Sequence, residues 1–232
     1  MTGIKKKAAL LLTAFYLTGS SFYGTQSYFN DRAQLENKLE FTGKDGLNAV
    51  LTEPSWKKEK GLLVVPNTTI PKDPQVTNTS EIDLDELVAL QCEFVYTDSC
   101  PDESKAGMLL STQDMMAVAE VFDIDYNSDD PEKGDWVRFE GQKDTDARQC
   151  FYYKKTLKRN YPDTGETTVP LFTRLKIDKT VNSSMFAGIQ AIGEFDIRIS
   201  GQILQQMTGE SFFGLDSAQK ACQEGLFDFK SE

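Results

Sequence analysis

The chain has 232 residues, a formal net charge of −11 and no histidine. An acidic surface repels phosphate backbones and anionic lipids, so we expect no nucleic acid partner. Without imidazole, the usual Ser and Cys hydrolases and hydrolytic zinc sites are excluded. Chemistry run by two carboxylates, as in glycoside hydrolysis, is a remaining alternative. We expect the protein not to be an enzyme and to use no cofactor.

The N-terminus predicts an export signal, residues 1–27, that is removed. The lysines at 5–7 precede an apolar stretch over 8–23, which gives way to small and polar residues. This order is typical of a secretory signal, and the apolar run falls short of the roughly 20 residues that span a bilayer. We expect signal peptidase to cut between Ser27 and Tyr28. The loss of three lysines and no acid changes the charge from −11 to −14. An uncleaved membrane anchor is the alternative.

The segment directly after the expected cut, residues 28–41, predicts a β-strand. Its apolar side chains share one parity, and polar residues lie between them; the apolar positions are Phe29, Ala33, Leu35, Leu39 and Phe41. Fully extended, the segment would span about 45 Å at roughly 3.3 Å per residue. Such a strand can pair with the sheet edge of another copy, or it can be the first strand of its own sheet. The alternation is the same in both cases.

Residues 42–232 predict a single all-β domain, because short alternating segments are separated by turn-forming residues. The expected strands are 47–51, 88–97, 149–157, 171–177 and 195–204. Each alternates with a period near two, which is typical of strands that bury one face. The clearest alternation is that of 195–204, which we expect to be a central strand. The pattern as a whole favours an antiparallel β-sandwich.

Two short helices are expected in the connections. Residues 112–121 follow Ser111, and Asp114 stands three positions after it, which approximates a capping box. A second, shorter helix is expected at 217–223, with Asp216 as its cap. Both are short interruptions of an otherwise β-rich chain.

Four cysteines remain after processing, and an even count in an exported protein favours disulfides. We expect Cys92 to pair with Cys100, because the turn formers between them can fold the chain back. This leaves Cys150 to pair with Cys222. The alternative is that Cys150 and Cys222 are unpaired core residues.

An acidic turn imitates the start of a calcium loop through oxygen-bearing residues at alternate positions, Asp123, Asp125, Asn127 and Asp129. The match then fails, since the sixth position is Ser128 instead of Gly and the twelfth is Gly134 instead of a bidentate Glu. A solvated acidic turn is the favoured interpretation. Weak calcium binding at this turn stays open, and we expect no metal site.

Four stretches carry a resemblance to a known family: 24–31, 47–56, 70–79, and 151–154 together with 165–172. The string Ile70-Pro71-Lys72-Asp73-Pro74-Gln75-Val76-Thr77-Asn78-Thr79 is the most specific of them. On these motifs the chain resembles the TasA/camelysin family of exported biofilm-matrix fibre proteins, which carry a SipW-type signal peptide. The four cysteines and the tail from 209 to 232 do not fit the family pattern. The proteolysis associated with camelysin is not carried over, because the chain has no histidine.

The resemblance implies a jelly-roll-like β-sandwich and a structural role. Some family members form fibres when the freed N-terminal segment of one subunit completes the sheet of the next. For this chain it implies a secreted matrix or cell-surface subunit without stable membrane insertion, whose partners are other copies of itself. Residues 28–41 would be the donor strand. A head-to-tail contact of this kind does not close, so it gives a filament.

A monomeric, adhesin-like surface-binding module is the alternative function. Its loops would contact a host ligand or a polysaccharide through exposed aromatic side chains, for which Trp56, Trp136, Tyr152 and Tyr153 are the candidates. These residues lie in or beside expected strands, where aromatic side chains are more often part of the core.

Overall fold

The computed structural model describes residues 39–42, 47–55, 67–98, 100–128, 134–177, 182–193, 195–206, 217–227 and 229. Its strands are β1 (Leu39–Thr42), β2 (Asn48–Thr52), β3 (Thr69–Pro71), β4 (Gln75–Asn78), β5 (Glu86–Tyr96), β6 (Phe122–Ile124), β7 (Trp136–Arg138), β8 (Arg148–Tyr153), β9 (Arg174–Ile177) and β10 (Phe195–Gln205). Its helices are η3 (Glu103–Lys105), α2 (Thr112–Val121), α3 (Ser183–Ile192) and α4 (Ala218–Gln223). Every strand pair among them is antiparallel. The expected all-β class with few short helices is confirmed.

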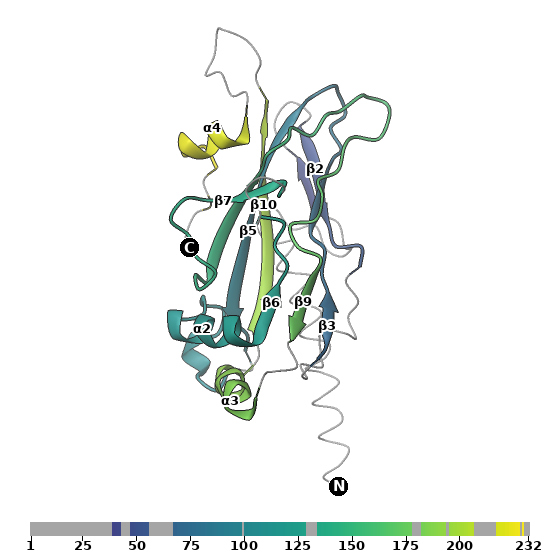
Figure 1. The fold of residues 1–232 in the computed structure, drawn as a ribbon. Coiled ribbons are helices and arrows are strands. Elements are labelled where there is room, and N and C mark those ends of the chain that lie inside the picture. The colour runs from purple at the N-terminus through teal and green to yellow at the C-terminus, as the bar shows by residue number, and fades with distance from the viewer. Residues whose placement is uncertain are drawn as a thin grey trace.

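The strands form three sheets, with the orders β10-β5-β8-β7, β1-β2-β4 and β3-β9-β6. In Figure 1 the four-stranded sheet stands on one side, and β2, β3 and β9 stand on the other. Backbone hydrogen bonds join the two three-stranded sheets. The N–H of Lys72 donates to the oxygen of Thr173 (3.1 Å), and the N–H of Leu171 donates to that of Pro74 (2.9 Å). The chain from β3 to β4 therefore runs antiparallel to the segment that leads into β9.

The main core draws on all three sheets and on α2. Its largest fully buried side chains include Trp136, Phe94, Phe151, Phe172 and Leu51. The aromatic rings pack closely: the Tyr126 and Phe151 rings stack with centroids 5.1 Å apart. Burial of such side chains is the main favourable contribution to folding, at about 1.5–3 kcal/mol each.

The strand β5 lies in the interior of its sheet and is buried on both faces over its whole length. One face belongs to the main core. On the other face, Leu87 and Ala89 form a second cluster with Ala218, Ala221 and Phe227 from the C-terminal region. The expectation that this strand buries one face only was wrong, because α4 covers the side that would otherwise meet solvent. Figure 1 shows α4 beside this sheet, on the side away from β2 and β3.

The helix α2 begins and ends as the sequence predicts. Ser111 is its N-cap, and the Ser111 hydroxyl accepts a hydrogen bond from the N–H of Asp114 (3.2 Å). The cap of α4 is Ser217, which accepts from the N–H of Lys220; Asp216, the expected cap, lies outside the described residues. The helix α3 was not predicted, and its cap is the side chain of Asn182. No helix in the described part of the chain is long and apolar enough to cross a membrane.

Gly165 lies against the backbone of β4. A Cβ atom at this position would stand 2.0 Å from the backbone oxygen of Asn78, and that backbone cannot move without breaking β-sheet hydrogen bonds. We expect Gly165→Ala to lower the free energy of unfolding by about 1–3 kcal/mol, as overpacked sites do. Urea unfolding followed by tryptophan fluorescence measures this. The neighbouring substitution at an exposed site, Thr164→Ala, is the control, and an equal effect of the two would contradict the contact.

A buried polar cluster connects β2, β4 and β5. The Ser80 hydroxyl donates to Oε1 of Glu86 (2.8 Å) and accepts from the N–H of Asn48 (2.9 Å). The Asn78 amide donates to the backbone oxygens of Leu84 and Leu157. Glu86, Ser80 and Asn78 are all fully buried. Burial raises the pKa of Glu86 to about 8, against a lowering by the Ser80 hydrogen bond and Arg159. This carboxyl group is thus mostly protonated at neutral pH.

This raised pKa predicts that stability falls as pH rises. Between about pH 4.5 and 8 the folded chain holds a proton on Glu86 that the unfolded chain has released, so the free energy of unfolding declines through this window and then levels off. At about 1.4 kcal/mol per pKa unit, the loss is several kcal/mol. Urea titrations from pH 5 to 9 should show that the free energy of unfolding declines with pH in the unsubstituted chain. The Glu86→Gln variant should show no such decline. Glu103→Gln, at an exposed position, should keep it. A slope that survives Glu86→Gln would contradict this assignment.

Candidate functional site

The end of the expected donor strand lies in β1. This strand pairs with β2 of the same chain, and the register places Leu39 opposite Leu51 and Phe41 opposite Ala49. Leu51 and Ala49 are buried in the main core. Of the predicted donor segment, residues 39–41 therefore belong to the chain's own sheet.

The other predicted N-terminal features lie outside the described residues. These are the signal segment, the cut between Ser27 and Tyr28, and the donor positions Phe29, Ala33 and Leu35. They stay predictions. Eleven residues, 28–38, lie between the expected cut and β1, and β10 also has eleven residues.

The strand β10 is the terminal strand of the four-stranded sheet among the described residues. We expected it to be central, and the structure corrects this: among the described strands, β5 has a neighbour on each side, whereas β10 has β5 as its neighbour and ends the sheet. The difference shows in burial. On the core face of β5, Val88, Leu90, Cys92 and Phe94 are at most 1% exposed, whereas Phe195, Ile197 and Ile203 of β10 are only partly buried. A long edge of this kind favours pairing with another strand.

The most specific sequence string, residues 70–79, forms a clamp on the end of β2. The Lys72 Nζ atom lies 2.7 Å and 2.9 Å from the two carboxylate oxygens of Glu53, and the two side chains are 4% and 9% exposed. The next residue, Asp73, accepts a hydrogen bond from the N–H of Ser55 (2.7 Å). Both contacts hold the chain after β2 against the connection from β3 to β4. The string thus has a structural use, which sequence reasoning did not identify.

All four cysteines are free thiols in the structure, which differs from the expected disulfides. The pairing of Cys92 with Cys100 is wrong here for a physical reason. Cys92 lies within β5, and the strand stays extended for four further residues before the turn that carries Cys100. At roughly 3.3 Å per residue this separates the two residues by more than a disulfide allows.

The second expected pair is brought together but not bonded. Cys150 lies on β8 and Cys222 on α4, which packs against β8. Burial raises the pKa of the Cys150 thiol to about 11, and the nearby Cys222 adds a smaller upward contribution. Cys150 donates weakly to Oε1 of Gln91, at 3.7 Å. Partial burial raises the pKa of the Cys222 thiol as well, so both thiols are protonated near neutral pH.

Side chains of the acidic turn after β6 accept hydrogen bonds from backbone N–H groups of the same chain. Oδ1 of Asp125 accepts from the N–H groups of Thr173 (2.9 Å) and Arg174 (2.8 Å). Oδ1 of Asn127 accepts from the N–H of Asp135 (3.2 Å). Asp129 lies outside the described residues, and within the described part no group of three His, Cys, Asp or Glu residues could hold a metal ion. These contacts favour a structural turn over a calcium loop.

The aromatic residues weighed as surface contacts are mostly internal. Trp136 is fully buried, and its Nε1 donates to the backbone oxygen of Val169 (2.9 Å). Tyr153 is 4% exposed, and its hydroxyl accepts from the N–H of Val169 (3.4 Å). Tyr152 is partly exposed and packs beside α4, while Trp56 lies outside the described residues.

Comparison with known proteins gives no relative: no protein-family model, curated protein or solved structure matches this chain.

Proposed function

We propose that this protein is an exported structural subunit of an extracellular fibre or matrix. After signal peptidase removes residues 1–27, the new N-terminal segment of one copy pairs with a sheet edge of the next, and repetition of this contact builds a filament. The proposal includes a jelly-roll-like arrangement of the β-sandwich and a location in the matrix or at the cell surface. It includes no catalytic activity. The resemblance of the sequence motifs to the TasA/camelysin family supports this proposal.

The observation that carries the proposal is the long edge of β10. Eleven residues of this strand pair on one side with β5, and three of its core-facing side chains, Phe195, Ile197 and Ile203, are only partly buried, while Ile199 between them is fully buried. An added strand would bring apolar side chains to cover this part of the core, and pockets for alternate side chains are how β-augmentation gains specificity.

The N-terminal segment fits this edge in length and in pattern. Residues 28–38 are as long as β10, and their apolar positions Phe29, Ala33 and Leu35 have one parity. Because β1 holds residues 39–42 in the chain's own sheet, it would anchor the segment and let the residues before it reach a neighbour. Residues 28–38 would span about 36 Å when extended, which suffices to cross between subunits.

The burial of Trp136 and Tyr153 weakens the alternative of a monomeric binding module. Neither ring is available to a ligand, and both take part in packing that a β-domain needs in any case. A monomeric binding module would then have to contact its surface ligand through residues other than these two.

A synthetic peptide with the sequence of residues 28–38 tests the proposal. Added in excess to the processed chain, it should occupy the acceptor edge, stop elongation and shorten the filaments seen by electron microscopy. A scrambled peptide of the same composition should leave their length unchanged. On the acceptor side, Ile203→Lys should weaken assembly, whereas Gln205→Lys at an exposed position of the same strand should not. Equal filament lengths with both peptides would refute the donor role.

A further inference from the structure

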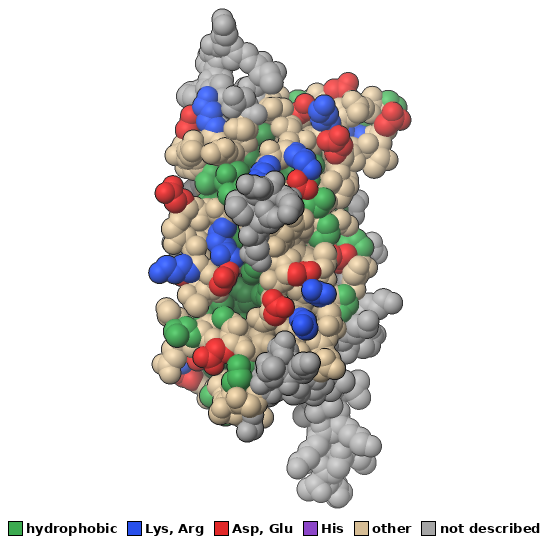
Figure 2. Space-filling model, viewed as in Figure 1, with side chains coloured by type: hydrophobic (Ala, Val, Ile, Leu, Met, Phe, Trp, Pro, Cys, Tyr) green, Lys and Arg blue, Asp and Glu red, His purple; other side chains and the backbone are tan. Residues whose placement is uncertain are grey.

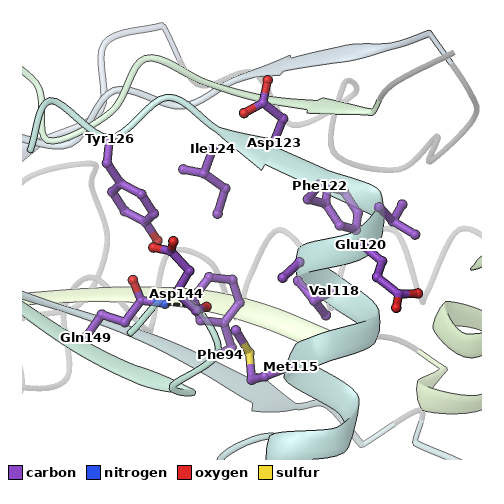
Figure 3. Close-up of a pocket in the computed structure, with 12 residues that line it drawn as sticks. Phe94, Met115, Val118, Glu120, Phe122, Asp123, Ile124, Tyr126, Asp144 and Gln149 are labelled. Carbon is purple, nitrogen blue, oxygen red and sulfur yellow. Dashed lines mark hydrogen bonds between the residues drawn. The ribbon is translucent and has the colours of Figure 1, made fainter. Parts of the chain in front are cut away.

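A pocket of about 330 Å³ lies between α2 and β6 and is closed below by β5 and β8. Figure 3 shows its lining: Met115 and Val118 come from α2, and Phe122 and Ile124 from β6. Its volume is at the lower end of the range of about 300 to 1,000 Å³ that is typical of small-molecule sites. Seen from outside in Figure 2, hydrophobic side chains are exposed in the hollow between these elements, with acidic side chains beside it.

A strip of apolar side chains from β5, α2 and β6 runs through the pocket. Phe94, Met115 and Val118 are at most 2% exposed and belong to the main core, and Phe122 and Ile124 continue the same surface. An unbranched apolar group would lie along these side chains without displacing any of them. Burial of its methylene groups would contribute about 0.8 kcal/mol each.

One end of the pocket is polar and offers a hydrogen-bond acceptor. Gln149 is 1% exposed, and its Nε2 donates to the backbone oxygens of Asp144 (3.1 Å) and Asp146 (3.0 Å). These two bonds fix the amide, so its Oε1 is the free acceptor; this buried atom has no hydrogen-bond partner in the described part of the chain. A buried carbonyl oxygen without a partner costs about 1–3 kcal/mol. A donor brought by a ligand would recover that cost.

The charges around the pocket favour a cation. Asp144 lines the same end as Gln149, while Glu120 and Asp123 are exposed at its rim. Arg138 forms an ion pair with Asp144, yet it does not line the pocket and instead stacks over the rings of Tyr126 and Phe151. No lysine or arginine lines the pocket. Arg138 offsets the charge of Asp144, so the net charge of −2 over these four groups comes from Glu120 and Asp123, and it leaves the surroundings of the pocket negative.

We propose that this pocket binds a primary alkylammonium compound, with the alkyl chain along α2 and β6 and the ammonium group at Gln149 and Asp144. An ammonium group has three donors and no acceptor, which matches an end lined by acceptors. A carboxylate would meet the field of Asp144, and an alcohol would satisfy Gln149 without gaining from the charge. No residue of β10 lines the pocket, so binding does not require assembly.

Three n-hexyl compounds added to the full processed chain test this assignment. Methyl resonances of Met115 and Ile124 should shift on titration with hexylammonium, and the affinity should be at least about 5-fold higher than for hexanol, which corresponds to about 1 kcal/mol. Hexanoate should not bind. Equal affinities for the ammonium and the alcohol would overturn the role of the ammonium group. Shifts that avoid Met115 and Ile124 would overturn the site.

Two variants extend the test. Ala119 is exposed and lines the pocket, so Ala119→Phe should fill the mouth and abolish the hexylammonium shifts. Met116, on the same helix, is 53% exposed and does not line the pocket, so Met116→Phe should leave binding unchanged. Asp144→Asn should reduce hexylammonium affinity at least about 5-fold and leave hexanol unaffected. Binding that survives both Ala119→Phe and Asp144→Asn would refute the proposal. Should Ala119→Phe unfold the chain, the ranking of the three compounds decides alone.

Discussion

Replacing Lys72 by alanine is expected to lower the free energy of unfolding by about 3–5 kcal/mol. The reason is that the variant leaves the carboxylate of Glu53 buried, at 9% exposure, without the ammonium group that now lies within 2.9 Å of both its oxygens. A buried charge without a partner costs far more than a lost surface contact. Urea unfolding at pH 7 should show the change as a lower midpoint with an unchanged slope.

A surface ion pair provides the matched control. Lys155 contacts Asp135 at 2.7 Å, but its side chain is 63% exposed. Lys155→Ala should therefore change stability by less than about 1 kcal/mol. The double variant Lys72→Met with Glu53→Leu should recover most of the stability that Lys72→Ala loses, because neither residue then leaves a charge behind. A Lys72→Ala effect as small as that of Lys155→Ala would contradict the buried clamp.

Deletion of residues 28–38 from the processed chain is expected to abolish filaments altogether. The deletion retains β1 and its pairing with β2, so the domain should fold and differ from the parent only in assembly. Light scattering after size exclusion should report a monomer at concentrations where the parent chain polymerises. Near-identical circular dichroism spectra and urea midpoints of the two chains would show that the fold is retained.

Single substitutions in residues 28–38 test whether assembly needs the alternation of apolar and polar side chains as well as the length of the segment. Leu35→Asp places a charge at an apolar position of the proposed donor strand and should suppress assembly, whereas Glu36→Ser changes an outward-facing position and should not. Filaments of normal length from the deletion variant would exclude the N-terminal segment from assembly. Equal behaviour of the two substitutions would show that its alternation has no role.

Local sequence patterns predicted the strands and helices that depend mainly on neighbouring residues. The alternation of residues 47–51 and the cap at Ser111 led to β2 and α2 almost residue for residue. The sequence could not place β10 in its sheet, because alternation reports how one strand's faces differ and says nothing about which strands flank it. The helix α3 was missed for a related reason: its start depends on the side chain of Asn182, a residue that fits turns and caps equally well.

The functional features depend on contacts between distant residues, which a single sequence does not display. Lys72 and Glu53 lie 19 positions apart, and only the fold makes them a buried pair. The pocket joins Gln149 to α2 across the sheet, and nothing near Gln149 in the sequence marks it as an acceptor. A signal did exist for Glu86: an acid at the start of an apolar run is a candidate for a buried, protonated group. The cysteine spacing misled, because the expected turn follows β5 but Cys92 lies four residues before the end of that strand.

Isotope-mixed photocrosslinking would locate the N-terminal segment most directly. Filaments would be assembled from equal amounts of light and heavy processed chains that carry a benzophenone side chain in place of Leu35, then irradiated, digested and analysed by mass spectrometry. Donation to a neighbour predicts crosslinked peptides that join a light N-terminal segment to a heavy β10, and the reverse, in statistical proportion. Crosslinks confined to peptides of one isotope would show that each chain keeps its own segment, and the proposed mode of assembly would be wrong.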